Sequence, residues 1–169
     1  MRDDSQRWDA PLPPDYAHSA KGITLTRTTL ARQVVVSGPR VLTQIEGPVA
    51  EWPGIVTGQS YALCLRTDRV LLVNGPPLSE GWHEGTDQAV SDASDAYAVV
   101  DISGPRSLEV LTRGAELSLQ HPSKSVARLL FGLGVFLYRH DSEDRFRIHV
   151  PSSQADALIQ SIKGAMAAC

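Results

Sequence analysis

Basic charge, long apolar runs and cysteine are all scarce in this sequence of 169 residues. Lysine and arginine total 16 against 19 aspartates and glutamates, so the formal charge is −3. A protein that binds the phosphate backbone normally carries a basic surface, and we therefore expect no nucleic-acid partner. No apolar run approaches the roughly 20 residues that span a bilayer, and residues 1–4 lack the basic start of a signal peptide. We expect a cytoplasmic protein with no membrane partner.

The cysteines are limited to Cys64 and Cys169. A disulfide between a core strand and a chain end is one interpretation, but in a reducing compartment two unrelated thiols are more common. Cys64 lies within a predicted strand, where a free cysteine behaves as a small hydrophobic residue. We predict that Cys64 belongs to the core.

Known catalytic and cofactor motifs are also missing. The chain has no Gly-x-Ser-x-Gly elbow, no phosphate-binding P-loop, no Gly-x-Gly-x-x-Gly turn and no Cys-x-x-Cys pair, so we expect no flavin or NAD held by this chain alone. None of the histidines stands three or four residues from another histidine or a cysteine, which gives no metal-ligand spacing. We predict surface or turn positions for them, least firmly for the one inside a strand, His149. The others are His18, His83, His121 and His140.

A few polar residues are candidates for chemistry. Asp101 lies in an otherwise apolar strand, on the face opposite its apolar neighbours, which favours a solvated or interface position; a base with a raised pKa is the alternative. The planar side chains of Arg106, Arg145 and Arg147 could bind a carboxylate or phosphate, although arginines at strand edges commonly face water or a partner. The segment 82–84, Trp-His-Glu, is the most enzyme-like cluster, and a surface loop explains it better. We therefore predict no catalytic, cofactor-binding or metal residue.

The stretch from Tyr97 to Gly114 is the central unit of the chain. Its alternating apolar residues predict a strand that Gly104 and Pro105 end, and proline is tolerated in the first turn of the helix that follows. We predict that Leu108 and Leu111 form the buried stripe of this helix. Glycine suits the left-handed position just past a helix end, which predicts that role for Gly114.

A Ser-Gly-Pro-Arg sequence occurs twice, at residues 37–40 and 103–106, each time directly after an apolar run. After each copy comes a predicted hairpin, residues 61–73 and 135–150, in which an apolar strand ends in Arg, a turn contains Asp, and a second strand opens on Arg. We interpret this as a diverged internal duplication of two pseudo-repeated halves. Coincidence is the alternative, because strand, turn and strand recur in most sheets.

The remaining segments complete a two-part organisation. Residues 1–22 are rich in proline and poor in aliphatic side chains, which predicts an extended or disordered arm, with Trp8 and Tyr16 able to order against a partner. Residues 23–169 are predicted to form one domain. Within it we predict strands at 23–26, 33–36, 116–119 and 125–131, a short helix at 88–93, and a closing helix from Pro151 that buries Leu158, Ile159 and Ile162 and ends at Gly164. Many strands with few helices indicate an α+β fold of ferredoxin-like arrangement.

Three blocks in a fixed order carry a resemblance to a known family: residues 63–73, residues 99–111 with Gly114 and 117–119, and residues 146–153. Together they resemble the gamma subunit of heterotetrameric sarcosine oxidase, a relative of the folate-binding aminomethyltransferase fold of the glycine cleavage T-protein. The resemblance covers residues 23–165. The polar turn 140–144 and the proline-rich start match nothing distinctive, and the chain is shorter than is usual for the family.

This resemblance implies an α+β, aminomethyltransferase-like fold and an accessory, non-catalytic role. It implies alpha, beta and delta subunits as partners, with FAD, FMN, NAD and the tetrahydrofolate site on the alpha and beta chains and zinc on the delta chain. The complex would oxidise sarcosine or a related N-methyl amino acid and pass the one-carbon unit to tetrahydrofolate. A free-standing folate-binding or one-carbon transfer protein of the same fold is the second hypothesis, and a small regulatory or ligand-binding module is the third.

Overall fold

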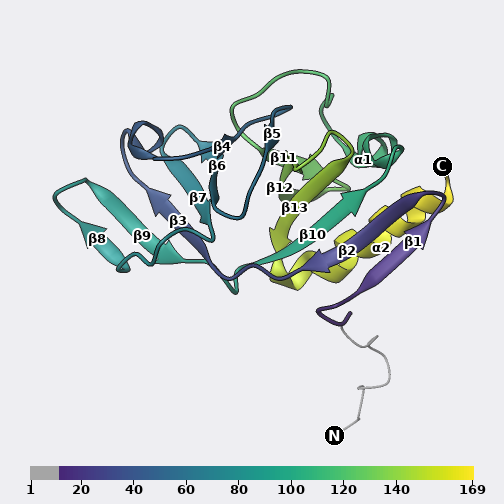
Figure 1. Ribbon diagram of the computed structural model, residues 1–169, viewed down its shortest axis with the longest axis horizontal. Coiled ribbons are helices and arrows are strands. Elements are labelled where there is room, and N and C mark those ends of the chain that lie inside the picture. The colour runs from purple at the N-terminus through teal and green to yellow at the C-terminus, as the bar shows by residue number, and fades with distance from the viewer. Residues whose placement is uncertain (1–11) are drawn as a thin grey trace, which may run out of the picture.

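Two β-sheets and two α-helices make up the part of the chain, residues 12–169, that the computed structural model describes. The fold is α+β, as predicted, and the two sheets stand side by side in Figure 1. Sheet A has the order β1-β2-β10-β13-β12-β11, with β5 paired to β12, and sheet B has the order β4-β6-β7-β3-β9-β8. The strands of sheet A are β1 (Ala17–Ala20), β2 (Ile23–Thr28), β5 (Ile55–Val56), β10 (Tyr97–Ser103), β11 (Ala127–Leu130), β12 (Leu133–His140) and β13 (Arg145–Pro151). Those of sheet B are β3 (Gln33–Ser37), β4 (Val49–Ala50), β6 (Tyr61–Arg66), β7 (Arg69–Val73), β8 (Gly81–His83) and β9 (Gln88–Asp92).

Both α-helices, α1 (Ser107–Gly114) and α2 (Ala155–Ala167), pack on one face of sheet A. Residues at alternate positions of β10 and β13 point to this face, and Ile102 and Ile148 are fully buried there. The predicted face of the closing helix is confirmed, because Leu158, Ile159 and Ile162 are all 0% exposed. Each such side chain contributes about 1.5–3 kcal/mol when it leaves water. The two helices therefore cover the outer face of sheet A and bury its apolar side chains.

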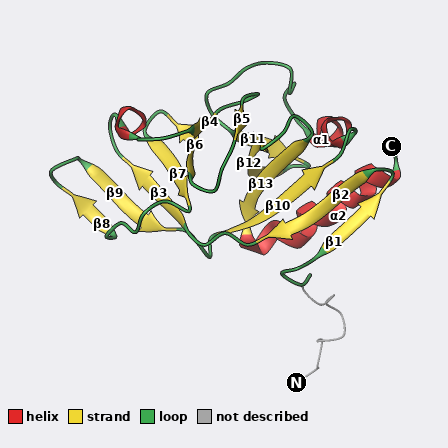
Figure 2. Cartoon of the chain, in the orientation of Figure 1, coloured by secondary structure: helices red, strands yellow, loops and turns green. Residues whose placement is uncertain are grey.

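The opposite face of sheet A meets sheet B. A second apolar cluster joins Leu63 and Leu71 of the β6–β7 hairpin to Tyr138 of β12. The outer face of sheet B carries a third, smaller cluster around Val36 and Val41, covered by the short helix η2 (Val41–Gln44). Figure 2 shows both α-helices on sheet A, whereas η2 is the short helical turn at sheet B.

The two Ser-Gly-Pro-Arg turns make the same backbone contacts. The amide of Gly38 donates to the carbonyl of Asp68 at 2.9 Å, and the amide of Gly104 donates to the carbonyl of Asp144 at 3.1 Å. Each aspartate belongs to the turn of the hairpin that follows. Each glycine therefore joins its turn to a hairpin in the same way.

The strand registers agree as well. The serine of each turn pairs with the arginine that opens the second hairpin strand: Ser37 with Arg69, and Ser103 with Arg145. A helix follows each turn, η2 in one case and α1 in the other. This register assigns every residue of β3 and β7 a counterpart in β10 and β13.

Several local predictions were wrong. The predicted helix at 88–93 is instead strand β9, because its backbone pairs with β3 and with β8, and sheet pairing overrides a weak helical preference. Residues 116–119 form no named strand; the amide of Glu116 bonds the carbonyl of Leu129, while the carbonyl of Leu119 accepts a bond from the indole of Trp52.

The limits of both helices also differ from the prediction. In α1 the buried residues are Ser107, Val110 and Leu111, which confirms the predicted burial of Leu111, whereas Leu108 is 37% exposed because it lies beside this i, i+3, i+4 stripe. Gly114 is the last residue of α1 itself, with no positive φ. The closing helix continues past Gly164 to Ala167.

At the N-terminal end, the structure describes only half of the predicted arm. Trp8 and the rest of residues 1–11 lie outside the described residues. Residues 17–20 form β1, which pairs with β2, and the amide of Leu12 bonds the carboxylate of Asp156 on α2 at 3.3 Å. Tyr16 packs against the core of sheet A beneath the ammonium group of Lys163. In residues 12–169, no helix has the length and apolar character needed to cross a membrane.

Candidate functional site

A buried ion pair lies between the two sheets. Asp101 of β10 is the cross-strand partner of Arg147 of β13, and both side chains leave the strands on the face toward sheet B. Nε of Arg147 donates to Oδ1 of Asp101 at 2.8 Å and Nη2 donates to Oδ2 at 2.9 Å. Arg145 adds a third bond to Oδ2 at 2.7 Å. The predicted solvated or interface position of Asp101 is wrong, since the residue is only 3% exposed.

The two arginines keep this carboxylate ionised. Burial by itself raises the pKa of Asp101, but the hydrogen bonds and charges of Arg147 and Arg145 outweigh it and hold that pKa below its ordinary value. In return, Asp101 raises the pKa of Arg147 in spite of its burial. The alternative of a base with a raised pKa is therefore wrong for Asp101.

From Arg147 a chain of hydrogen bonds continues through buried side chains. Nη1 of Arg147 donates to the hydroxyl of Tyr61 at 2.9 Å, which lies 2.8 Å from the hydroxyl of Tyr138. The hydroxyl of Tyr138 lies 2.8 Å from Nε2 of His149, and Nδ1 of His149 lies 2.7 Å from Oε1 of Gln33. We call the set Gln33, Tyr61, Asp101, Tyr138, Arg147 and His149 the inter-sheet network.

The far end of the network sets the direction of every bond in it. Nε2 of Gln33 donates to the carbonyl of Tyr97 at 2.9 Å, so Oε1 of Gln33 must accept from Nδ1 of His149. Burial, reinforced by the positive charge of Arg147, lowers the pKa of His149 to about 3, so the ring is neutral. Its Nε2 then accepts from Tyr138, Tyr138 accepts from Tyr61, and Tyr61 accepts from Arg147. Each donor in the chain has one defined acceptor.

This arrangement suits a structural role better than a chemical one. Burial raises the pKa values of both tyrosine hydroxyls, so neither is prepared to act as a nucleophile. The network connects β10, β12 and β13 of sheet A with β3 and β6 of sheet B. At the counterpart positions of Asp101 and Arg147, the other half has Val35 and Leu71, which pair in the same register. The polar pair is therefore a feature of one half only.

Of the five histidines, His18, His83 and His121 lie at or near the surface, as predicted. His140 and His149 do not, because both lie on buried positions of sheet A, at 2% and 0% exposure. Burial and the charge of Arg147 lower the pKa of His140, whose Nε2 lies 3.1 Å from the carbonyl of Gly58. Across residues 12–169, no three His, Cys, Asp or Glu side chains gather as a possible metal site.

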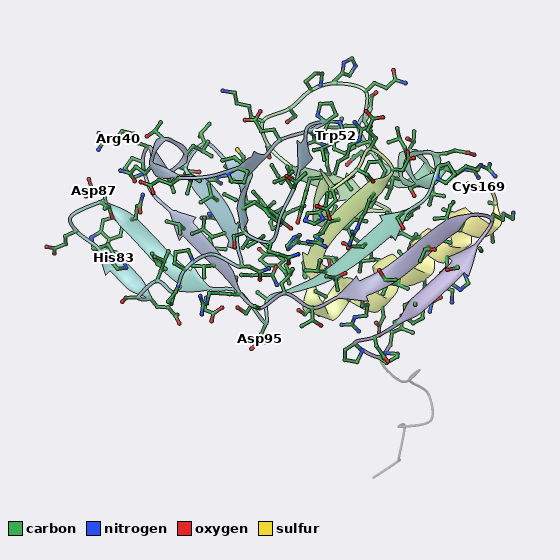
Figure 3. The ribbon with its side chains drawn as sticks, viewed as in Figure 1. Arg40, Trp52, His83, Asp87, Asp95 and Cys169 are labelled. Atoms are coloured by element: carbon green, nitrogen blue, oxygen red, sulfur yellow. The ribbon has the colours of Figure 1, made fainter. Side chains whose placement is uncertain are left out.

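The other candidates lie apart from the network. Trp82, 61% exposed, belongs to the edge strand β8, and Figure 3 shows His83 of the same strand at the outer end of sheet B. Arg106 forms a surface ion pair with Glu109 at 2.9 Å. Cys64 is 3% exposed, which confirms its predicted place in the core, and neither it nor Cys169 forms a disulfide.

Sequence reasoning missed Gln33, Tyr61 and Tyr138 as members of the network. The available signal was the pair Arg147 and His149, two positions apart in a strand that alternates polar and apolar residues from Arg145 onward. Such spacing places both side chains on one face, where they need polar partners. The identity of those partners depends on how the two sheets pack.

Comparison with protein-family models gives no match, and no curated protein matches the sequence. Among solved structures, a chain of the heterotetrameric sarcosine oxidase from Corynebacterium sp. U-96, in complex with pyrrole 2-carboxylate, is similar. The TM-score is 0.63 at 20% sequence identity, and the match covers 86% of this chain and 84% of that chain. The protein thus shares its α+β fold with a chain of a heterotetrameric sarcosine oxidase.

Proposed function

We propose that this protein is an accessory, non-catalytic subunit of a sarcosine-oxidase-type complex, equivalent to its gamma subunit. The observation that carries the proposal is the fold likeness over 86% of this chain and 84% of the other. Coverage of this extent in both directions means that the likeness extends over most of each chain and is not confined to a shared motif. The three sequence blocks that resemble the gamma family support the same assignment.

The inter-sheet network supports the non-catalytic part of the proposal. Its ionisable groups are buried and engaged with one another, so they stabilise the contact between the sheets. Tyr61, Tyr138, Arg147 and His149 also fill the space between the sheets, and tetrahydrofolate could enter there only by displacing them. The residues present do not fit a folate site at this place.

On this proposal, the chemistry belongs to alpha, beta and delta partner chains. Those chains would hold FAD, FMN, NAD, the tetrahydrofolate site and zinc, as the resemblance implies. The complex would oxidise sarcosine or a related N-methyl amino acid in the cytoplasm and transfer the one-carbon unit to tetrahydrofolate. This chain would contribute the surfaces that hold the larger chains in place.

We also propose that residues 23–169 form one domain of the aminomethyltransferase-like, ferredoxin-like type with two pseudo-repeated halves. Support comes from the matched turns, since Gly38 and Gly104 make equivalent backbone bonds. The equal registers of Ser37 with Arg69 and of Ser103 with Arg145 add to it. Two unrelated hairpins have no reason to agree in both features.

Co-expression tests the proposed function. This chain should be produced with the sarcosine-oxidase-type alpha, beta and delta chains of the same organism, with a tag on the alpha chain. We expect this chain to co-elute with the tagged chain through affinity and size-exclusion columns at micromolar concentration. Separation of this chain from an otherwise intact assembly would overturn the proposal.

Calorimetry separates the proposal from the free-standing folate-binding protein. The isolated chain is titrated with tetrahydrofolate, and we expect no heat of binding because the inter-sheet space is occupied. Saturable binding by the isolated chain would overturn the non-catalytic assignment.

A further inference from the structure

Within residues 12–169, no α-helix covers the outer face of sheet B, whereas α1 and α2 cover the outer face of sheet A (Figure 2). Under α1 and α2, Ile102 and Ile148 of sheet A are 0% exposed. Their counterparts by register are Val36 and Leu72 of sheet B, and Leu72 remains partly exposed. The same side of the two halves is therefore sealed by α-helices in one and covered only in part, by η2, in the other.

The path of the chain after β13 and after β7 explains why sheet B lacks such a helix. From Pro151, the last residue of β13, it passes directly into η3 (Ser152–Gln154) and α2. After β7 it runs through Asn74, Gly75, Pro76 and Pro77, and a proline pair cannot continue a helix. The chain then adds β8 and β9 to the edge of sheet B instead of returning across its outer face.

An apolar groove remains on that face, beside η2. Its volume is about 320 Å³. The apolar residues that line it include Val36, Val41, Ile45, Ala62, Leu72 and Leu78. Leu78 is 41% exposed at its margin. An apolar lining of this kind stabilises a partner that brings its own apolar side chains.

The charge around the groove is negative. Residues 32–92 contain four arginines, seven carboxylates and no lysine, and one of the arginines, Arg32, donates to the carbonyl of Gly75 at 2.9 Å, a residue that lines the groove. Glu46 lines the groove, and Glu80, Glu84 and Asp87 are exposed on the segment that forms the β8–β9 hairpin, at whose tip Figure 3 shows Asp87. Gln88 of the same hairpin also lines the groove, so the hairpin that carries these carboxylates borders the groove. Such a rim attracts a positively charged partner.

We propose that this groove docks an amphipathic α-helix with basic flanking residues, supplied by a partner chain. The helix takes on sheet B the place that α2 takes on sheet A. Its apolar side chains enter the groove beside η2, and its lysines or arginines face the acidic rim. The identity of the partner as a larger subunit of the complex rests on the proposed function.

Site-specific photo-crosslinking tests this inference in the co-expressed complex. p-Benzoylphenylalanine replaces Leu78 in one sample and Leu117 in a matched control. Leu117 is 72% exposed but lies in the loop after α1, away from the groove. After irradiation, mass spectrometry identifies the crosslinked peptides. We expect the probe at residue 78 to capture a helical, lysine- or arginine-rich segment of a partner chain, and the probe at residue 117 not to capture that segment.

Charge reversal provides a second measurement. The double variant E46K/E80K should weaken co-purification of the partner at least tenfold at low salt, and the control E116K, on the other side of the molecule, should not. Crosslinking of residue 78 to a second copy of this chain or to residues 1–11 would overturn the inference. An intact complex without a crosslink at residue 78 would overturn it while leaving the proposed function standing, whereas failure of the unmodified chain to form a complex would overturn the proposed function.

Discussion

Replacement of Asp101 by valine isolates the energetic role of the inter-sheet network. Valine is the residue at the counterpart position, Val35, so the strand accommodates its shape. The substitution removes the acceptor of two hydrogen bonds from Arg147, whose side chain is 7% exposed. The guanidinium group is then a buried charge without a counter-charge.

Burial of the ion pair determines how large the loss of stability should be. Removal of one partner of a buried ion pair costs about 3–5 kcal/mol, because the remaining charge loses both water and its partner. Arg145 adds little, since its side chain is 38% exposed and can return to water. We therefore expect Asp101→Val to lower the free energy of unfolding by about 3–5 kcal/mol, a large share of the stability of an ordinary domain.

The double variant D101V/R147L is the matched control, because it installs the Val35 and Leu71 arrangement of the other half. Replacing a complete buried pair by apolar residues of similar size is often neutral or stabilising. We expect the double variant to unfold within about 2 kcal/mol of the unaltered chain, the residual cost coming from the lost bond to Tyr61. Urea unfolding of the full chain, followed by circular dichroism, measures both. A single variant that costs less than about 1 kcal/mol, or a double variant as unstable as the single one, would refute the reasoning.

Three further predictions follow from buried groups and close backbone contacts. The pKa of His149 is about 3 in the folded chain against an ordinary 6.5, so the unfolded chain binds the extra proton between these values. The free energy of unfolding should therefore fall as the pH falls, by up to about 1.4 kcal/mol per pH unit. In unfolding experiments between about pH 7 and about pH 5, His149→Gln should remove this part of the pH dependence. Gly104→Ala should destabilise the folded chain by more than about 2 kcal/mol in thermal unfolding, because φ is +125° and the added Cβ would meet a backbone oxygen. The control Gly134→Ala should not, because the added Cβ would enter open space. Iodoacetamide should label Cys169 in the folded chain but Cys64 only after unfolding, because burial shields the thiol of Cys64 and raises its pKa. Equal labelling rates of the two cysteines, measured by mass spectrometry, would contradict this.

The sequence predicts most of the central unit because its signals are local. Alternation of apolar residues identifies β10, and the Gly-Pro pair marks its end. The hairpin of β6 and β7 and the core face of α2 follow from the same kind of pattern. Helix ends and weakly patterned segments, such as β9, depend on pairing with distant strands, and local propensity does not decide them.

The inter-sheet network could be predicted only in part. The position of Asp101 on the face opposite its apolar neighbours follows from strand alternation, but its burial does not. That burial depends on sheet B covering the face and on two arginines from β13 reaching the carboxylate. A charged residue in a strand is usually at the surface, and the exception arises from contacts between residues 44 and 46 positions apart in the chain.

Native mass spectrometry of the co-expressed chains tests the central claim, that this protein acts by assembly with larger subunits. We expect an assembly whose mass corresponds to one copy of this chain with one copy each of the alpha, beta and delta chains. We also expect that omission of its gene leaves the alpha, beta and delta chains without an intact assembly. Detection of this chain solely as free monomers or homo-oligomers, beside an alpha, beta and delta assembly that forms without it, would contradict the account.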